Sequence, residues 1–116
     1  MTIKILAVSL MLAGLATPAS AHAFLQHASP AAGDMLAGAP AQVDLEFTKP
    51  LDPKGCGIEV TDEAGHEMDA ATVTVDGADM RVALKPLAAG RDHLSWRVLS
   101  TDTHETEGSF NFTVMP

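Results

Sequence analysis

Residues 94–104 read Leu-Ser-Trp-Arg-Val-Leu-Ser-Thr-Asp-Thr-His and contain both a strand signal and a group of polar side chains. Every second residue from Leu94 to Val98 is apolar, which is the period of a β-strand with one buried face. Asp102 and His104 follow two positions apart, so on extended backbone both side chains would project from one face. The segment therefore predicts a half-buried strand followed by a carboxylate and an imidazole that could meet at one metal ion. By itself, such a triplet is more often an exposed loop in which the carboxylate folds back on the backbone.

The same alternation recurs along the chain and predicts an all-β fold. Pro- and Gly-rich breaks separate about seven short strands, and Asp76-Gly77 is a strong hairpin signal. A sheet with one apolar face must bury that face against another layer. We therefore expect a Greek-key, immunoglobulin-like β-sandwich with Trp96 as its large central core residue. The expected strands are Phe24–Ala28, Val43–Phe47, Ile58–Val60, Val73–Val75, Met80–Leu84, Leu94–Leu99 and Phe110–Val114.

Residues 1–21 are typical of a removable signal peptide. A short basic start precedes the apolar or small segment Ile5–Ala16, and Ala19-Ser20-Ala21 matches a small-x-small cleavage pattern. Roughly 20 apolar residues are needed to cross a bilayer, so this segment is too short to be a membrane-spanning helix. We expect one domain over residues 22–116, exported to the periplasm, with the extracellular medium as the alternative.

Charge and cysteine content limit the partners and the sources of stability. The chain of 116 residues has a formal net charge of −8, and removal of Lys4 with the signal would leave a charge of −9. Such a surface repels nucleic acid and anionic lipid. Cys56 is the only cysteine, so no intramolecular disulfide reinforces the domain. We interpret Cys56 as a small packed residue rather than as a soft ligand or a dimerisation point.

His22 would become the first residue of the processed chain. Cleavage after Ala21 exposes its amine, and that amine can close a six-membered chelate ring around a cupric ion together with Nδ1 of the same residue. Nitrogen donors of this kind favour copper over calcium or magnesium. A cut after Ala23 would also satisfy the small-x-small rule, but it would discard this chelate.

Taken together, these motifs and their order resemble the CopC/PcoC family of periplasmic copper-resistance and copper-trafficking proteins. The resemblance covers nearly all of the expected domain. It rests on the start His22-Ala23-Phe24-Leu25, on Ala28–Gly33, on Val43–Phe47 leading into Lys49-Pro50-Leu51, and on Trp96–His104 running to Phe110.

The resemblance implies a Greek-key β-sandwich that binds one Cu(II) ion per chain. Its ligands would be the amine and imidazole of His22 together with Asp102 and His104. Three nitrogens and one carboxylate oxygen suit tetragonal Cu(II). The expected function is a non-enzymatic carrier or buffer in copper trafficking or resistance, with an inner-membrane partner of the CopD type.

One departure from the family concerns Cu(I). Some members bind Cu(I) in a methionine-rich segment, whereas the corresponding stretch of this chain, Gly55–Ala71, contains only Met68 with His66 nearby. Cu(I) prefers several soft thioethers close together. We therefore predict a protein that binds Cu(II) only. The other methionines are expected in the core, in a Pro/Gly-rich connection and in the tail, as Met80, Met35 and Met115.

Two alternative functions stay open. A processed N-terminal histidine with a second histidine is also how lytic polysaccharide monooxygenases hold copper, although this chain is short and poor in aromatic residues for binding a sugar chain. The other alternative is an exported sandwich module that only packs against a partner. His27, His66 and His93 are expected at the surface, and Glu105 and Glu107 are expected as solvated acids of a loop.

Overall fold

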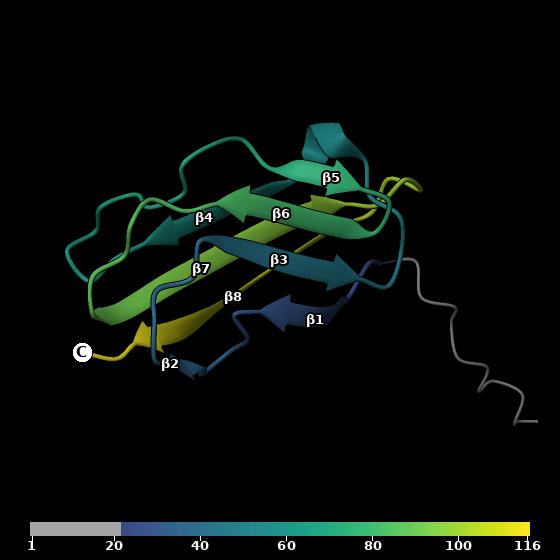
Figure 1. Cartoon of the computed structure of the whole chain (residues 1–116). Coiled ribbons are helices and arrows are strands. Elements are labelled where there is room, and N and C mark those ends of the chain that lie inside the picture. Colours follow the sequence, from purple (N-terminus) through teal and green to yellow (C-terminus); the bar gives the residue numbers. More distant parts are fainter. Residues whose placement is uncertain (1–21) are drawn as a thin grey trace, which may run out of the picture.

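The computed structural model describes residues 22–116, and it confirms the all-β prediction. Two four-stranded sheets pack face to face, with strand orders β1-β3-β6-β5 and β2-β8-β7-β4 (Figure 1). The expected signal peptide, residues 1–21, lies outside the described residues. The strands are β1 (Leu25–Ser29), β2 (Met35–Leu36), β3 (Gln42–Phe47), β4 (Gly57–Thr61), β5 (Thr74–Asp76), β6 (Asp79–Ala83), β7 (Gly90–Leu99) and β8 (Glu105–Val114).

Seven of these strands correspond to the expected ones, and β2 is an addition. It is only two residues long and pairs in parallel with β8, at Met35 with Thr113 and Leu36 with Val114. Two residues are too few for an alternation to be recognised in the sequence. The only helical element of the described part is the short 3-10 turn η2 (Pro53–Gly55).

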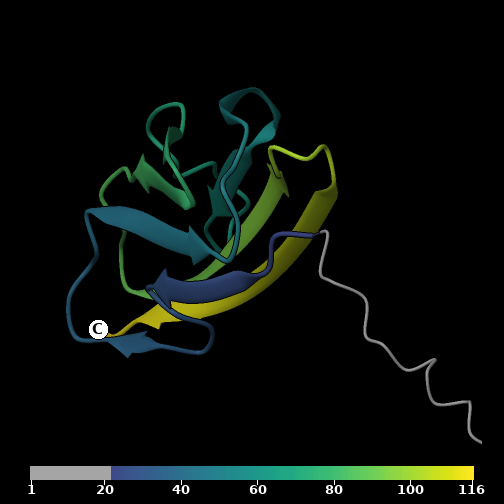
Figure 2. The ribbon, with the colours of Figure 1, turned by 90° about the vertical axis from the view of Figure 1, so that its right-hand side faces the viewer.

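Strands β7 and β8 form a long curved hairpin that runs the length of the sandwich (Figure 2). They pair continuously from Gly90 with Val114 to Leu99 with Glu105. Strand β8 therefore begins several residues before the expected Phe110, and our prediction that Glu105 and Glu107 lie in a loop is wrong. The early part of β8 lacks an apolar alternation, so only its pairing with β7 identifies it as a strand. Both acids are nevertheless exposed.

The core lies between the sheets and follows the predicted parity. Among the described residues, Phe112 is the largest fully buried side chain, and Met80 is 1% exposed as predicted. Trp96 is not the central core residue that we expected: it is only partly buried and packs edge-to-face on Phe47, with ring centroids 5.0 Å apart. Tryptophan is too large to be covered completely in most small cores. Within residues 22–116, no helix has the length and apolarity to cross a membrane.

Candidate metal site

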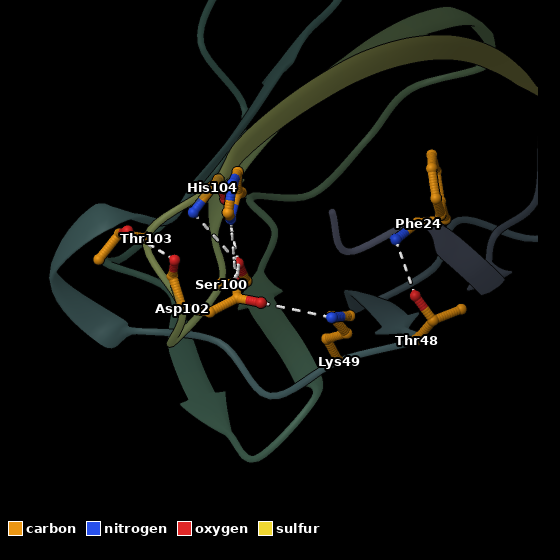
Figure 3. A network of polar contacts seen from close by, with 7 residues as sticks. All are labelled: Phe24, Thr48, Lys49, Ser100, Asp102, Thr103 and His104. Carbon is orange, nitrogen blue, oxygen red and sulfur yellow. Dashed lines mark hydrogen bonds and ion pairs between the residues drawn. The ribbon is translucent and has the colours of Figure 1, made fainter. Parts of the chain in front are cut away.

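The Asp-x-His triplet lies in the tight turn between β7 and β8. From the sequence we considered extended backbone here, but the structure has a turn. The N–H of Ser100 donates to the carbonyl of His104 at 3.0 Å, and the N–H of Thr103 donates to the carbonyl of Ser100 at 2.8 Å. Thr103 adopts a left-handed φ of 70°. The turn still brings the two side chains together, with Nδ1 of His104 3.4 Å from Oδ1 of Asp102 (Figure 3).

Asp102 is held from both sides by polar groups. The hydroxyl of the buried Ser100 donates to Oδ1, and Nζ of Lys49 donates to Oδ2 at 3.3 Å. The Ser100 hydrogen bond, followed by the contacts with Lys49 and His104, lowers the pKa of Asp102 to about 2. The carboxylate is therefore ionised near neutral pH, which is the form that a metal ion requires.

The start of the described chain places His22 next to this turn. Ala23 is fully buried, and its carbonyl accepts a hydrogen bond of 2.8 Å from Oγ1 of Thr106 on β8. The N–H of Phe24 donates to Oγ1 of Thr48 at 2.9 Å. In this arrangement the ring of His22 meets the ring of His104 edge-on, with centroids 5.1 Å apart.

The three residues singled out from the sequence thus form a chain of neighbours: His22 contacts His104, and His104 contacts Asp102. They do not form a closed ligand set, because residues 22–116 contain no group of three or more His, Cys, Asp or Glu side chains already arranged to hold a metal ion. Ala21 precedes His22 in the sequence, so the amine of His22 would become a donor only after cleavage at that bond.

The other histidines lie at the surface, as expected. His27 is exposed on β1, opposite Glu46. The exposed ring of His66 contacts Asp62, with Nδ1 3.1 Å from Oδ2. His93 contacts Asn111 across the hairpin in the same way, with Nδ1 2.7 Å from Oδ1.

Cys56 is a partly buried free thiol. Its Sγ donates to the carbonyl of Asp52 at 3.2 Å, and burial raises the pKa of the thiol. This agrees with a packed cysteine rather than a reactive thiolate.

Two exposed methionines lie on neighbouring segments of the chain, which the sequence did not suggest. Met35 on β2 and Met115 beyond β8 are both exposed, and the N–H of Met115 donates to the carbonyl of Leu36 at 2.8 Å, so both residues lie at one edge of the sheet. Met68 packs against the core instead. Only the pairing of β2 with β8 reveals this neighbourhood.

Four residues that support the site were also missed from the sequence. They share a polar contact to a ligand candidate or to the backbone beside one, and they are Thr48, Lys49, Ser100 and Thr106. Ser100 adjoins the Asp-x-His triplet, and Lys49 belongs to one of the stretches that carry the family resemblance, so both had a signal. The two threonines had none.

Comparison with known proteins identifies the family. A family model described as the CopC domain matches residues 25–115. The chain belongs to the CopC family. It is 40% identical to copper resistance protein C from Xanthomonas campestris pv. juglandis, over 66% of this chain and 67% of that protein. The CopC match includes Asp102 and His104 but begins after His22.

Solved CopC-family structures have the same fold. The crystal structure of CopC from Methylosinus trichosporium OB3b is 33% identical and superimposes with a TM-score of 0.76, covering 82% of this chain and 95% of that one. PcoC from Escherichia coli, described as a methionine-rich copper resistance protein, is also 33% identical, with a TM-score of 0.69 over 81% of this chain and 99% of that one. The chain is therefore a β-sandwich of the CopC type with a copper-related function.

Proposed function

We propose that this chain is a periplasmic Cu(II)-binding protein that acts in copper trafficking, buffering or resistance. One Cu(II) ion would be bound by the amine and Nδ1 of His22 with Asp102 and His104. The observation that carries the proposal is the 5.1 Å contact between the rings of His22 and His104, beside a carboxylate 3.4 Å from His104. Residues from opposite ends of the domain supply these groups, and their chemistry is that of a tetragonal Cu(II) site.

The choice of Cu(II) over Cu(I) follows from the donor set. Two imidazoles, an amine and a carboxylate include no soft ligand, so reduction of the bound ion should loosen it. After anaerobic reduction and desalting, we expect the protein to lose its copper. Retention of a full equivalent would contradict this, and replacement of Met35 and Met115 by leucine would then show whether those thioethers hold it.

Export and delivery belong to the same proposal. A signal peptide over residues 1–21, cut after Ala21, would both send the protein to the periplasm and create the amine ligand. A membrane copper transporter of the CopD type is the partner that the family resemblance implies. The intact mass of the exported protein, with and without one equivalent of copper, tests the cleavage point and the stoichiometry together.

The ligands are tested by competition titration against a copper chelator. Replacing His104 by alanine removes one of the proposed nitrogen ligands, so we expect Cu(II) affinity to fall strongly while the sandwich stays folded, since the residue lies in an exposed turn. Asp102→Ala should weaken binding less. His93→Ala, another exposed histidine of the same hairpin, is the matched control and should bind like the wild type. Unchanged affinity in the His104 variant would remove this residue from the site.

An oxidative copper enzyme is the second candidate, because two histidines including an N-terminal one could also hold copper for oxygen chemistry. The carboxylate of Asp102 lies beside His104 and would occupy a position that such chemistry needs open. We therefore favour the carrier. Turnover of a polysaccharide in the presence of a reductant would decide for the enzyme instead.

A further inference from the structure

Three polar contacts hold the main chain just after His22. The hydroxyl of Thr106 donates to the carbonyl of Ala23 at 2.8 Å, and the residue that carries this carbonyl is fully buried. On the other side, Thr48 makes two contacts with Phe24: its Oγ1 accepts from the N–H of Phe24, and its own N–H donates to the carbonyl of Phe24, both at 2.9 Å. Chain ends are usually poorly ordered unless such contacts tie them down.

The segments that contain Thr48 and Thr106 also lie next to the other two candidate ligands, Asp102 and His104. Thr106 follows His104 by two residues, and Thr48 precedes Lys49, whose ammonium group binds Oδ2 of Asp102 (Figure 3). The contacts of Thr48 and Thr106 therefore place the chain next to His22 at the same corner of the sandwich as Asp102 and His104. Without them, the backbone at Ala23 and Phe24 would lose three contacts that tie it to this corner.

We propose that Thr106, together with Thr48, is a positioning residue for copper: its hydroxyl fixes the backbone at Ala23 so that the imidazole of His22 is held against that of His104. The inference rests on the proposed function, because it assigns a role to the site described there. Neither threonine contacts the ion. Each acts through the backbone, by arranging the N-terminal chelate before copper arrives.

The test uses protein exported from the full chain, with its N-terminus checked by intact mass. Thr106→Val keeps the shape of the side chain but removes the donor, whereas Thr106→Ser keeps the hydroxyl. Thr113→Val is the matched control, since Thr113 is also half-buried on β8 but near its far end. Two readouts are compared: the nuclear Overhauser contact between the two imidazole rings in metal-free protein, and the affinity and electron paramagnetic resonance spectrum of bound Cu(II).

Thr106→Val should lose the ring contact and bind Cu(II) about 10–100-fold more weakly, with an altered spectrum, since this is the usual effect of removing a group that orients a metal ligand. Thr106→Ser and Thr113→Val should match the wild type. A Thr106→Val protein that keeps the ring contact, the affinity and the spectrum would overturn the inference.

A second variant covers the case in which Thr106→Val fails to fold. Thr48 is exposed in a loop, so Thr48→Val should fold, and it should weaken the same ring contact and lower the Cu(II) affinity. Wild-type values in a folded Thr48→Val protein would then overturn the inference. If the wild-type protein binds no Cu(II), the proposed function fails, and the ring contact in metal-free protein still decides whether the threonines position His22.

Discussion

Two aspartates of this chain have opposite environments, and each has a measurable consequence. Asp102 is exposed at the site but surrounded by donors, so its pKa is lowered to about 2. Asp92 on β7 is only 2% exposed, and its Oδ2 has no hydrogen-bond partner in the described structure. Burial, followed by the neighbouring charges of Asp62 and Glu63, raises the pKa of Asp92.

Replacing Ser100 by alanine should raise the pKa of Asp102 from about 2 toward its ordinary value, because the Ser100 hydroxyl is the largest single cause of the lowered pKa. A lowered pKa in the folded state stabilises the protein above the unfolded pKa of about 3.9, and this stabilisation is lost as the pH falls toward about 2. The titration can be followed by carboxyl NMR in metal-free protein. Lys49→Met should produce a smaller shift, and a larger shift in that variant would mean that Lys49, rather than Ser100, dominates the pKa of Asp102.

Replacing Asp92 by asparagine should stabilise the protein at neutral pH. Since the pKa of Asp92 is raised in the folded state, stability falls as the pH rises from about 3.9 through that raised pKa, and the penalty is complete above it. Asparagine keeps a polar atom at this position but removes the buried charge, and each 1 kcal/mol gained in this way would raise the melting temperature of a domain of this size by about 4–8 °C.

The pH dependence separates this effect from a general change in charge. The gain from Asp92→Asn should vanish near pH 3, where the carboxyl group is protonated in both states. Glu46→Gln removes the same charge at an exposed position of β3 and should leave the melting temperature nearly unchanged. Equal melting temperatures for Asp92→Asn and wild type at pH 7 would show that the buried carboxylate carries no penalty.

At the scale of elements, the hairpin of β7 and β8 contributes buried residues to the core, and its turn carries Asp102 and His104 of the candidate metal site. Gly108 on β8 faces Trp96 on β7 in the pairing register. A Cβ atom at position 108 would lie 2.5 Å from Cζ2 of Trp96, which is closer than two carbon atoms can approach. The glycine therefore lets the indole lie over the neighbouring strand and against Phe47.

Replacing Gly108 by alanine should force Trp96 to move and destabilise the domain by about 1–3 kcal/mol, the usual cost of overpacking. Denaturant unfolding, followed by tryptophan fluorescence, measures both the stability and the changed environment of the single indole. Ser109→Ala, at the adjacent exposed position, is the control and should have little effect. A Gly108→Ala protein of wild-type stability would mean that the strand pair relaxes without cost.

At the scale of the whole molecule, the candidate site connects the start of the domain to its last hairpin. A ligand that binds the folded state alone stabilises it by mass action, by about 2.7 kcal/mol at a free concentration one hundred times its Kd. Because the proposed ligands come from distant parts of the sequence and meet only in the fold, copper should stabilise the entire sandwich rather than one segment.

The melting temperature should therefore rise with Cu(II), and the rise should shrink between about pH 7.5 and 5.5. In that range protons compete with copper for the terminal amine, whose ordinary pKa is about 7.7–8.0, whereas Asp102 stays ionised because its pKa is about 2. Calorimetric scans with and without copper measure the effect. Protein with one extra residue ahead of His22 should show a much smaller rise, and an equal rise would contradict the N-terminal chelate.

The alternation of apolar residues was sufficient to predict most of the fold, because successive side chains of a strand point to opposite faces and a buried face therefore needs an apolar residue at every second position. The expected cleavage site pointed to His22, the i, i+2 spacing pointed to Asp102 and His104, and the family resemblance implied that the three act as one ligand set. Sequence reasoning failed for strands that are formed by backbone pairing with a neighbouring strand and have no apolar alternation of their own. Strand β2 and the first half of β8 lack an apolar alternation, and they exist because a partner strand binds their backbone.

Tertiary structure alone decided how the candidate ligands meet. The Asp-x-His pair converges through a turn with Thr103 at a positive φ rather than through extended backbone. The ring of His22 lies against that of His104, and the chain just after His22 is hydrogen-bonded to Thr48 and Thr106. Such contacts between residues far apart in the sequence leave no periodic pattern in it. Composition and spacing thus determined which groups the protein offers, whereas long-range contacts determined their distances, because only the folded chain brings the start of the domain and the β7–β8 turn to one corner.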